Sequence, residues 1–512
     1  MTELLTDLTA QQKDYAIFLP AISSFYVMHV SKQRFENFID PARIPSHFVN
    51  GLESVNWLAP EGMYQYEFSL YSAGHANIDM SKEVPGEDMI RNRNRNTSFV
   101  MGDSGGFQIA KGIWKADWKD PNCPKASTKR KEVLTWLDAN FDYGIILDIP
   151  AWVRHNKKVH KNIGVSTYEE AVIATEINNE YFIRNRNGDC KYLNVMHGET
   201  HSDADDWYER MKKYCDPKQY STHFDGWAMG GQNMCDIHII LKRLVTMMRD
   251  GLLEEGVHDW MHFLGTSKIE WAVLLTDIQR AVRKHYNKNF TVSYDAASPF
   301  LSTINANVYY ELDMQNRKKW LYRSGTGIDD TSLSNDTTPY GQAFIKHWNE
   351  KKFKGVSVLD KFLESPVTQG LTVKDICVDS EGRRNKVEKL AHEERLEALG
   401  GKSRIIDKRS WDTFSYFLLM AHNVWAHIHA TQEANRLYDE GIVPSMLVDE
   451  KHERVFFRDI IDEIIGCADS DKAFKLIDEH SRFWTSIIGS RGMTGKRATN
   501  ALTQFDNLFK EN

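Results

Sequence analysis

The segment SFVMGDSGGFQ, residues 98–108, is an apolar run that ends on an aspartate and is followed by a serine and two glycines. A near-continuous apolar run of this length is typical of a β-strand covered on both faces, as in a parallel sheet. An earlier run, FYVMHV (25–30), is expected to begin a series of such strands. The later members are YGIILDIP (143–150), KYLNVMHG (191–198), GWAMGG (226–231), WMHFLGT (260–266) and FTVSYDAA (290–297).

Amphipathic stretches separate these runs, among them residues 166–186, 235–253 and 267–286. In the last stretch, one buried helical stripe is predicted to contain Ile269, Val273, Leu274, Ile278 and Val282. Alternating strands and helices predict a parallel sheet with crossover helices, an α/β fold. A closed (β/α)8 TIM-type barrel and an open doubly wound sheet both fit this pattern. We favour the barrel, because no G-x-G-x-x-G motif follows the first strand.

The rest of the chain departs from this alternation. Residues 311–405 contain a short hairpin, a polar loop and a charged helix over 379–402, which we interpret as an insertion. Beyond them the pattern is helical, with a break at 441–446. We therefore expect a barrel over residues 1–435 that is interrupted by this insertion, and a helical C-terminal segment over 436–512.

Composition excludes several classes of protein. The chain has 512 residues, of which 41% are apolar and 26% charged, so it is not disordered, collagen-like or a disulfide scaffold. Its net charge of −7 argues against a protein that coats nucleic acid through bulk charge, although it leaves room for a local basic surface. No secretory signal and no apolar run near the ~18 residues of a membrane helix are visible. Six cysteines without a C-x-x-C pair complete the prediction of a soluble, cytoplasmic protein.

Polar residues fall at or near the C-terminal ends of the expected strands: Asp103, Asp148, His197, Gly230–Gly231 and Asp295. In a barrel these ends converge on one face, where catalytic groups lie. Each residue alone has a structural interpretation, because an Asp after a strand often caps a helix and Gly-Gly often forms a turn. Three carboxylates on one face suit substitution at an anomeric carbon. One attacks, a second transfers the proton of the leaving group, and the third orients that group.

The hexapeptide Asp103-Ser104-Gly105-Gly106-Phe107-Gln108 resembles the DSGGFQ signature of the tRNA-guanine transglycosylase superfamily. Further motifs of that family are resembled, in the same order, by LDIP (147–150), DGWAMGG (225–231), HFLG (262–265) and YDAAS (294–298). The resemblance covers roughly residues 20–430, with clear motifs between 98 and 300.

The resemblance implies a role for each of these residues. Asp295 would attack C1′ of a nucleotide and expel guanine, while Asp103 would protonate the departing base and deprotonate the incoming one. The carboxylate of Asp148 and the glycine backbone would read the base edge, and an aromatic ring would stack on the base. Substrate binding is thereby implied for Ser104, Gly105, Phe107, Asp148, Gly230 and Gly231. The chemistry requires no cofactor, because one N-glycosidic bond is exchanged for another.

The chain departs from the family pattern at three places. His197-Gly198 stands where the family has Gln-Gly, so either base recognition differs or His197 replaces the amide as donor. Residues 299–303 (PFLST) replace the arginines that follow the nucleophile in bacterial tRNA enzymes. The family's zinc site is incomplete, because only Cys377 and His422 resemble its four ligands. A structural zinc is therefore left open.

The family contains enzymes that act on tRNA and phage or bacterial enzymes that insert 7-deazaguanine bases into DNA. The incomplete zinc motif, the missing arginines and a C-terminus (491–512) unlike the RNA-binding module of archaeal tRNA enzymes favour the DNA type. We expect exchange of guanine in DNA for a free base such as 7-cyano-7-deazaguanine (preQ0), in the host cytoplasm if a phage encodes the chain. A tRNA enzyme and a catalytically silent nucleic-acid-binding subunit are the alternatives.

Basic residues near the expected strand ends are candidates for holding the nucleic-acid backbone. Three belong to the alternating run RNRNRN before Asp103, and the others follow Asp103 or Asp148. A solvated face is the other interpretation of each cluster. The candidates are Arg91, Arg93, Arg95, Lys129, Arg130, Lys157 and Lys158.

Overall fold

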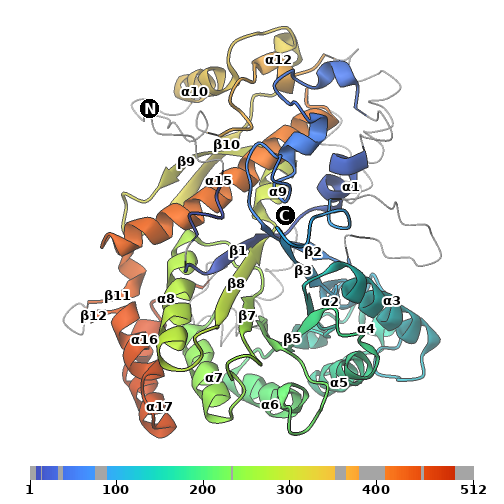
Figure 1. Ribbon diagram of the computed structural model, residues 1–512, viewed down its shortest axis with the longest axis vertical. Helices are drawn as coiled ribbons and strands as arrows, with labels where there is room; N and C mark the ends of the chain where they lie inside the picture. The colour runs from blue at the N-terminus through green and yellow to red at the C-terminus, as the bar shows by residue number, and fades with distance from the viewer. Residues whose placement is uncertain are drawn as a thin grey trace.

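A computed structural model of the protein describes residues 7–12, 14–32, 39–74, 76, 89–231, 235–351, 365–379, 410–450 and 455–489. Eight parallel strands form a nearly closed barrel with helices between them, which confirms the predicted (β/α)8 fold (Figure 1). The neighbouring strands follow the order β1-β8-β7-β6-β5-β4-β3-β2. They are β1 (Ile17–Pro20), β2 (Phe68–Ser72), β3 (Phe99–Asp103), β4 (Tyr143–Ile145), β5 (Lys191–Met196), β6 (Gly226–Met229), β7 (Trp260–Phe263) and β8 (Thr291–Ala296).

The two ends of the sheet meet between β1 and β2. Just beyond β1, the amide of Ile22 donates a hydrogen bond to the carbonyl of Leu70 in β2, at 2.9 Å. The hydroxyl of Ser69 donates to the carbonyl of Pro20 at 2.8 Å. These bonds bring the end of β2 beside β1, so the residues at the ends of both strands face the same barrel mouth, the face formed by the C-terminal ends of the strands.

The predicted first strand at 25–30 is wrong, because these residues lie in helix α1 (Ser24–Lys32). A short apolar run fits a buried strand and a buried helix equally well. The hydroxyl of Ser23 accepts a hydrogen bond from the amide of Tyr26 at 3.3 Å, as residues before a helix do. The barrel instead begins with β1 and β2, neither of which the sequence patterns predicted.

The other six predicted strands are confirmed, and helices follow them. The stripe predicted on α8, from Ile269 to Val282, is buried. The helices after β3 to β8 are α2 (Gly106–Ala110), α3 (Pro124–Asn140), α4 (His160–Ile163), α5 (Tyr168–Asn185), α6 (His201–Met211), α7 (Ile237–Arg249), α8 (Ile269–His285) and α9 (Ser298–Ile304).

Aromatic rings fill the N-terminal end of the barrel. The ring of Phe99 stacks on Trp260 at 4.6 Å between centroids, and Tyr143 lies 4.9 Å from Trp260. These residues begin β3, β7 and β4. Because side chains alternate along a strand, Asp103 on β3 and His262 on β7 lie on the same side of their strands as these rings. The interior is therefore aromatic at one end and polar at the mouth.

The insertion begins with an antiparallel hairpin of β9 (Asn307–Asp313) and β10 (Leu321–Thr326), followed by α10 (Tyr340–Lys351) and α12 (Val373–Ile376). A hairpin was predicted in this part of the chain. The predicted charged helix at 379–402 lies outside the described residues, apart from Asp379.

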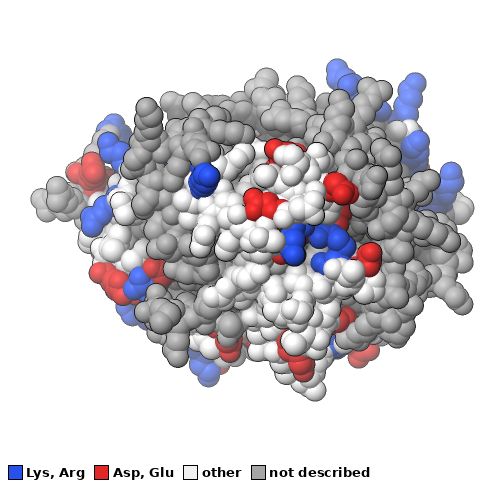
Figure 2. All heavy atoms as spheres, turned by 90° about the horizontal axis from the view of Figure 1, so that it is seen from above, with Lys and Arg blue, Asp and Glu red and all other residues white. Residues whose placement is uncertain are grey.

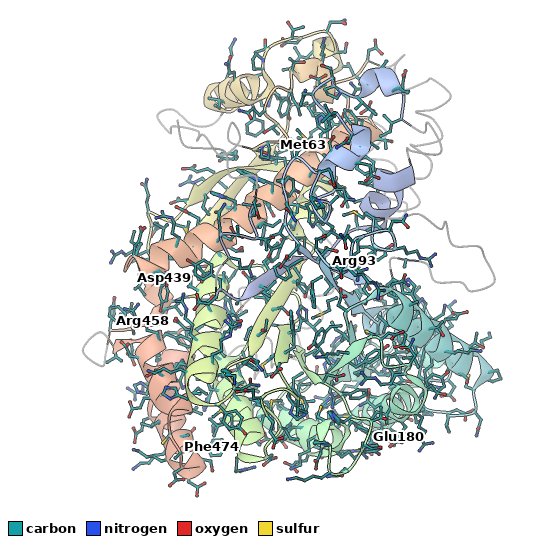
Figure 3. All side chains as sticks on the ribbon, viewed as in Figure 1. Met63, Arg93, Glu180, Asp439, Arg458 and Phe474 are labelled. Atoms are coloured by element: carbon teal, nitrogen blue, oxygen red, sulfur yellow. The ribbon has the colours of Figure 1, made fainter. Side chains whose placement is uncertain are left out.

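The C-terminal segment packs along the barrel. Helix α15 (Thr413–Asp439) contacts α8, α9 and β9, while α16 (Phe457–Ile465) continues along α8 and α17 (Ser470–Glu479) along α7 (Figure 1). Asp439, at the end of α15, pairs with Arg280 of α8 at 2.7 Å, and the guanidinium of Arg458 lies 5.6 Å from the ring centroid of Tyr438 (Figure 3).

The rest of this segment comprises β11 (Val448–Asp449), β12 (Val455–Phe456) and α18 (Ser481–Trp484). The expected domain boundary at 435/436 falls within α15, and the division into domains stays a prediction. Among the described residues, no helix is both long enough and apolar enough to cross a membrane.

Candidate active site at the barrel mouth

The structure places the predicted polar residues at the barrel mouth. Asp103 ends β3, Asp295 is the penultimate residue of β8, and His197 directly follows β5. Asp103 is close enough to Asp148 and Asp295 for their charges to affect it. Burial, chiefly, and these two carboxylates raise the pKa of Asp103 to about 6. The three carboxylates thus form one electrostatically coupled group.

The two glycines after Asp103 are required by the geometry of the turn. Gly105 has φ of +83°, a left-handed conformation that favours glycine. A Cβ atom on Gly106 would lie 2.6 Å from both the backbone oxygen and Oδ1 of Asp148. The hydroxyl of Ser104 donates to the carbonyl of Ile146 at 2.8 Å. The turn therefore brings the backbone after β3 against the carboxylate that follows β4.

Asp103 has two differently held oxygens. Its Oδ2 accepts a hydrogen bond of 2.6 Å from the hydroxyl of Ser72, at the end of β2. The amide of Gly74 donates to that hydroxyl at 3.2 Å, which orients it. Within the part of the chain that the structure describes, Oδ1 accepts one long bond of 3.4 Å, from the amide of Gly105. Oδ1 is therefore the better-placed oxygen to exchange a proton with a bound base.

Asp295 is held through one oxygen. Its Oδ1 accepts a hydrogen bond from the amide of Gly265 at 2.7 Å and lies 3.2 Å from Nε2 of His262. Among the described residues, Oδ2 has no hydrogen-bond partner, and the side chain is 13% exposed. One oxygen thus fixes the carboxylate while the other is left to react. This is the arrangement that a carboxylate nucleophile needs.

A chain of hydrogen bonds fixes the proton on His262. The indole N–H of Trp260 donates to Oγ of Ser293 at 2.8 Å, and Oγ lies 2.9 Å from Nδ1 of His262. If the serine proton points to Nδ1, the proton of the imidazole is on Nε2 and faces the carboxylate of Asp295. The opposite tautomer would set a lone pair against that carboxylate. The fully buried His262 is therefore a donor to Asp295.

Asp148 and His197 form a buried pair. Nε2 of His197 lies 2.6 Å from Oδ2 of Asp148, and the imidazole packs edge-on against Trp207 at 4.9 Å between centroids. A Cβ on Gly230 would lie 3.1 Å from Cε1 of His197, so the Gly230–Gly231 turn lies directly against the imidazole. The sequence analysis gave Asp148 and His197 separate roles in base binding, whereas in the structure the two side chains contact each other.

Phe107, expected to stack on a base, lies on α2 beside Asp103. Its side chain is 41% exposed, which is unusual for a phenylalanine in the first turn of a helix beside buried carboxylates. The ring lies 6.1 Å from Trp152, and Nζ of Lys111 lies 5.0 Å from its centroid. An exposed ring with a cation above it is suited to contact a flat, polar ring.

The basic candidates divide between two ends of the barrel. Arg93 has a side chain that is 1% exposed, pairs with Asp142 at 2.8 Å and donates to the carbonyl of Asn140 (Figure 3). Arg95 donates to the carbonyl of Ala139 at 2.5 Å. With the partly exposed Arg91, these residues precede β3 and lie toward its N-terminal end, away from Asp103.

The candidates after Asp103 and Asp148 lie on the mouth side. Arg130 is buried there, and its Nε donates a hydrogen bond to the side chain of Asn178 at 2.6 Å. Lys129 pairs with Glu132 at 2.5 Å. Lys157 and Lys158 are exposed.

The two zinc candidates bind backbone carbonyls. Sγ of Cys377 lies 3.5 Å from the carbonyl of Ile328, and Nε2 of His422 donates to the carbonyl of Tyr309 at 2.7 Å. Burial lowers the pKa of His422 to about 4. Among the described residues, no group of three or more His, Cys, Asp or Glu is placed to hold a metal ion. Both candidate side chains are thus in contact with backbone carbonyls.

Sequence reasoning missed three contributors to the site. Ser72 was missed because β2 was not recognised. His262 and Gly265 were seen only as a family motif, although a histidine in a buried strand is a signal that it carries a hydrogen bond. Neither a protein-family model nor a curated protein matches this chain.

Proposed function

We propose that the protein is a DNA-guanine transglycosylase that exchanges guanine for a 7-deazaguanine base through a covalent intermediate on Asp295. The observation that carries the proposal is the contrast between two neighbouring carboxyl groups. Burial raises the pKa of Asp103 to about 6, so it can hold a proton near neutral pH, whereas Asp295 accepts two N–H hydrogen bonds through one oxygen. An acid beside a nucleophile is the pair that glycosyl exchange needs.

The reaction has two balanced displacements. Oδ2 of Asp295 attacks C1′ of the nucleotide, an ester bond forms, and the bond from C1′ to the base breaks. The electron pair leaves with guanine, which takes the proton of Asp103. In the second displacement Asp103, now a carboxylate, removes a proton from the incoming base, whose nitrogen attacks C1′ and releases Asp295. Configuration at C1′ is retained, because each displacement inverts it.

The base would lie between the buried pair and the exposed ring. Asp148, held by His197, and the Gly230–Gly231 turn form one polar wall, and Phe107 offers an apolar face. A target guanine must leave its base stack to enter such a site, at a cost of a few kcal/mol.

Two departures from the tRNA-type pattern support DNA over tRNA. The segment after Asp295 forms α9 without an arginine, and its Leu301 is 53% exposed. The His-Asn segment makes packing contacts through Asn423. Asn423 accepts a hydrogen bond from the amide of Tyr309 at 2.9 Å and donates to Thr303 at 2.9 Å, which ties α15 to β9 and α9.

Base exchange tests the proposal directly. The purified chain is incubated with labelled 7-cyano-7-deazaguanine and either guanine-containing DNA or tRNA. We expect label in DNA, release of guanine, and neither event with Asp295→Asn. Asp189→Asn is the matched control, because Asp189 is exposed and precedes β5 at the opposite end of the barrel. Label in tRNA alone would make the protein a tRNA enzyme. No label in either would favour a silent subunit.

A further inference from the structure

The segments that follow β3, which ends in Asp103, and β4, which precedes Asp148, form one continuous surface. The amide of Ala116 donates to the carbonyl of Asn162 at 2.9 Å, and the amide of Trp118 donates to Ile163 at 3.0 Å. The side chain of Asn156 reaches the carbonyl of Ala110 at 3.3 Å. Residues 104–132 and 151–165 are thereby joined, and we call them together the lysine surface.

This surface opposes the overall charge of the chain. Its two segments contain eleven Lys and Arg and three Asp and Glu, a net charge of +8, whereas the whole chain carries −7. Of these cations, Arg130 is buried, and Lys119 and Arg154 pair with Glu170 and Asp203 of neighbouring elements. Figure 2 shows Lys and Arg projecting at the right-hand rim, the side of the molecule on which α3 lies in Figure 1. The exposed lysines of the surface include Lys115, Lys125, Lys131, Lys157, Lys158 and Lys161.

A cavity of about 380 Å³ opens in the lysine surface. Its lining includes Trp114, Lys115, Lys125, Lys129 and Glu132, which pairs with Lys129, and the fully buried Trp118 lies behind it. The volume lies within the roughly 300–1,000 Å³ of ordinary ligand sites.

Trp114 is the ring that connects this cavity to the active site. A Cβ on Gly105 would lie 2.8 Å from its ring edge, so the indole packs against the turn that follows Asp103. Nζ of Lys129 lies 5.2 Å from the centroid of the same ring. Nearby, Ile113 is 63% exposed. Aromatic and apolar side chains are thus interleaved with cations, beginning beside the catalytic carboxylate.

We propose that the lysine surface binds the single-stranded DNA next to the target guanine, with a base against Trp114 and the phosphates on the surrounding lysines. The choice of DNA rests on the proposed function. The positive charge complements phosphate. A base can stack on the partly exposed indole of Trp114 only if it has left its own base stack. A single strand presents such unstacked bases, whereas a duplex does not. If these lysines formed only a solvated face, a cavity lined by a tryptophan would have no role there.

Direct binding tests this inference without using catalysis. A fluorescein-labelled, guanine-containing oligodeoxynucleotide is titrated with the full chain over a range of salt concentrations, as a single strand, as a duplex and as RNA of the same sequence. We expect the single-stranded DNA to bind most tightly. Trp114→Ala should weaken its binding roughly 5- to 100-fold, the range of a lost base–aromatic stack, and Trp114→Phe should restore most of that loss.

The salt dependence of DNA binding tests the role of the lysines separately. Lys115→Ala with Lys125→Ala should lower the slope of log affinity against log salt by roughly 0.7 for each phosphate that the variant no longer binds. Lys218→Ala is the matched control, because Lys218 is exposed and precedes β6 at the opposite end of the barrel. It should leave both affinity and slope unchanged.

Three results would overturn the inference. They are unchanged binding in the Trp114 and lysine variants, tighter binding of duplex than of single strand, and tighter binding of RNA than of DNA. Failure of the proposed function is a separate result. In that case the single strand binds through this surface, yet no base is exchanged.

Discussion

At the scale of single residues, Asp103 and Asp295 show how two identical side chains are given different tasks. Asp103 is buried, so its carboxylic acid form is favoured and its pKa rises to about 6, while the hydrogen bond from Ser72 acts in the opposite direction. Asp295 lies 13% exposed beside an amide and an imidazole that both stabilise a carboxylate. In the proposed reaction, burial suits Asp103 to act as the acid, and the two N–H donors orient Asp295 as the nucleophile.

The hydroxyl of Ser72 opposes the effect of burial on Asp103, because it donates to the charged form of the carboxyl group. Expulsion of guanine needs the protonated acid, so its rate should fall as pH rises through the pKa of Asp103. Ser72→Ala removes a bond that lowers this pKa, and the midpoint of the fall should therefore move to higher pH. Single-turnover guanine release against pH measures the midpoint.

The control for this shift lies on the same strand. Ser69 donates to the carbonyl of Pro20 and not to Asp103, so Ser69→Ala should leave the midpoint in place. A midpoint that stays fixed or falls in Ser72→Ala would contradict the assignment of Ser72.

His262 should act as a positioning residue for Asp295. His262→Ala removes the donor to Oδ1 and should slow guanine release roughly 10- to 100-fold, the range for a hydrogen bond to a charged group, with KM for DNA little changed. His262→Gln keeps an N–H on a flexible side chain and should recover part of the rate. Ser293→Ala should be milder than His262→Ala, since the imidazole remains. Equal loss in the Ala and Gln variants, or a change in KM alone, would contradict this role.

At the scale of elements, the sequence patterns predicted six barrel strands and missed two. The six are apolar runs that end in or are soon followed by the polar residues of the candidate site, which makes the runs recognisable, although β4 ends at Ile145 rather than at Pro150. β2 contains two serines, Ser69 and Ser72, that bond within the barrel and interrupt its apolar pattern. The apolar run at 25–30 was assigned to a strand because its hydrophobicity does not reveal the cap at Ser23.

The packing of α8 against α15 contains a buried acid. Burial raises the pKa of Asp277 from 3.8 to about 7, and the hydroxyl of Tyr438 donates to it at 2.6 Å. Between these two pH values the folded protein binds more protons than the unfolded chain, so stability falls as pH rises. Asp277→Asn should therefore stabilise the protein above pH 7, by up to roughly 4 kcal/mol, and have little effect near the lower value.

Urea unfolding at one pH below this window and one above it measures the difference. Asp439→Asn is a useful control, because Asp439 pairs with Arg280 near the surface of the same helix contact. Equal destabilisation by Asp277→Asn at both pH values would mean that the variant loses packing and that the charge of Asp277 does not matter.

At the scale of the whole molecule, the net charge of the chain does not show how the fold distributes charged residues over the surface. The net charge of −7 for the whole chain does not reveal that residues 104–132 and 151–165, beside Asp103 and Asp148, are rich in lysine. The sequence placed basic residues after both carboxylates, but only the fold joins these loops through Ala116 and Asn162. It also buries Arg130 and turns Arg93 toward the opposite end of the barrel, which spacing along the chain does not reveal.

The central claim is that Asp295 forms a covalent bond to DNA as guanine leaves. The most direct test mixes the protein with a guanine-containing single strand, without an incoming base, and measures the intact mass of the denatured protein. The account predicts an adduct with the mass of the strand minus guanine, in the wild type and not in Asp295→Asn. An adduct that persists in Asp295→Asn, or guanine released by the wild type with no adduct at any time, would contradict it.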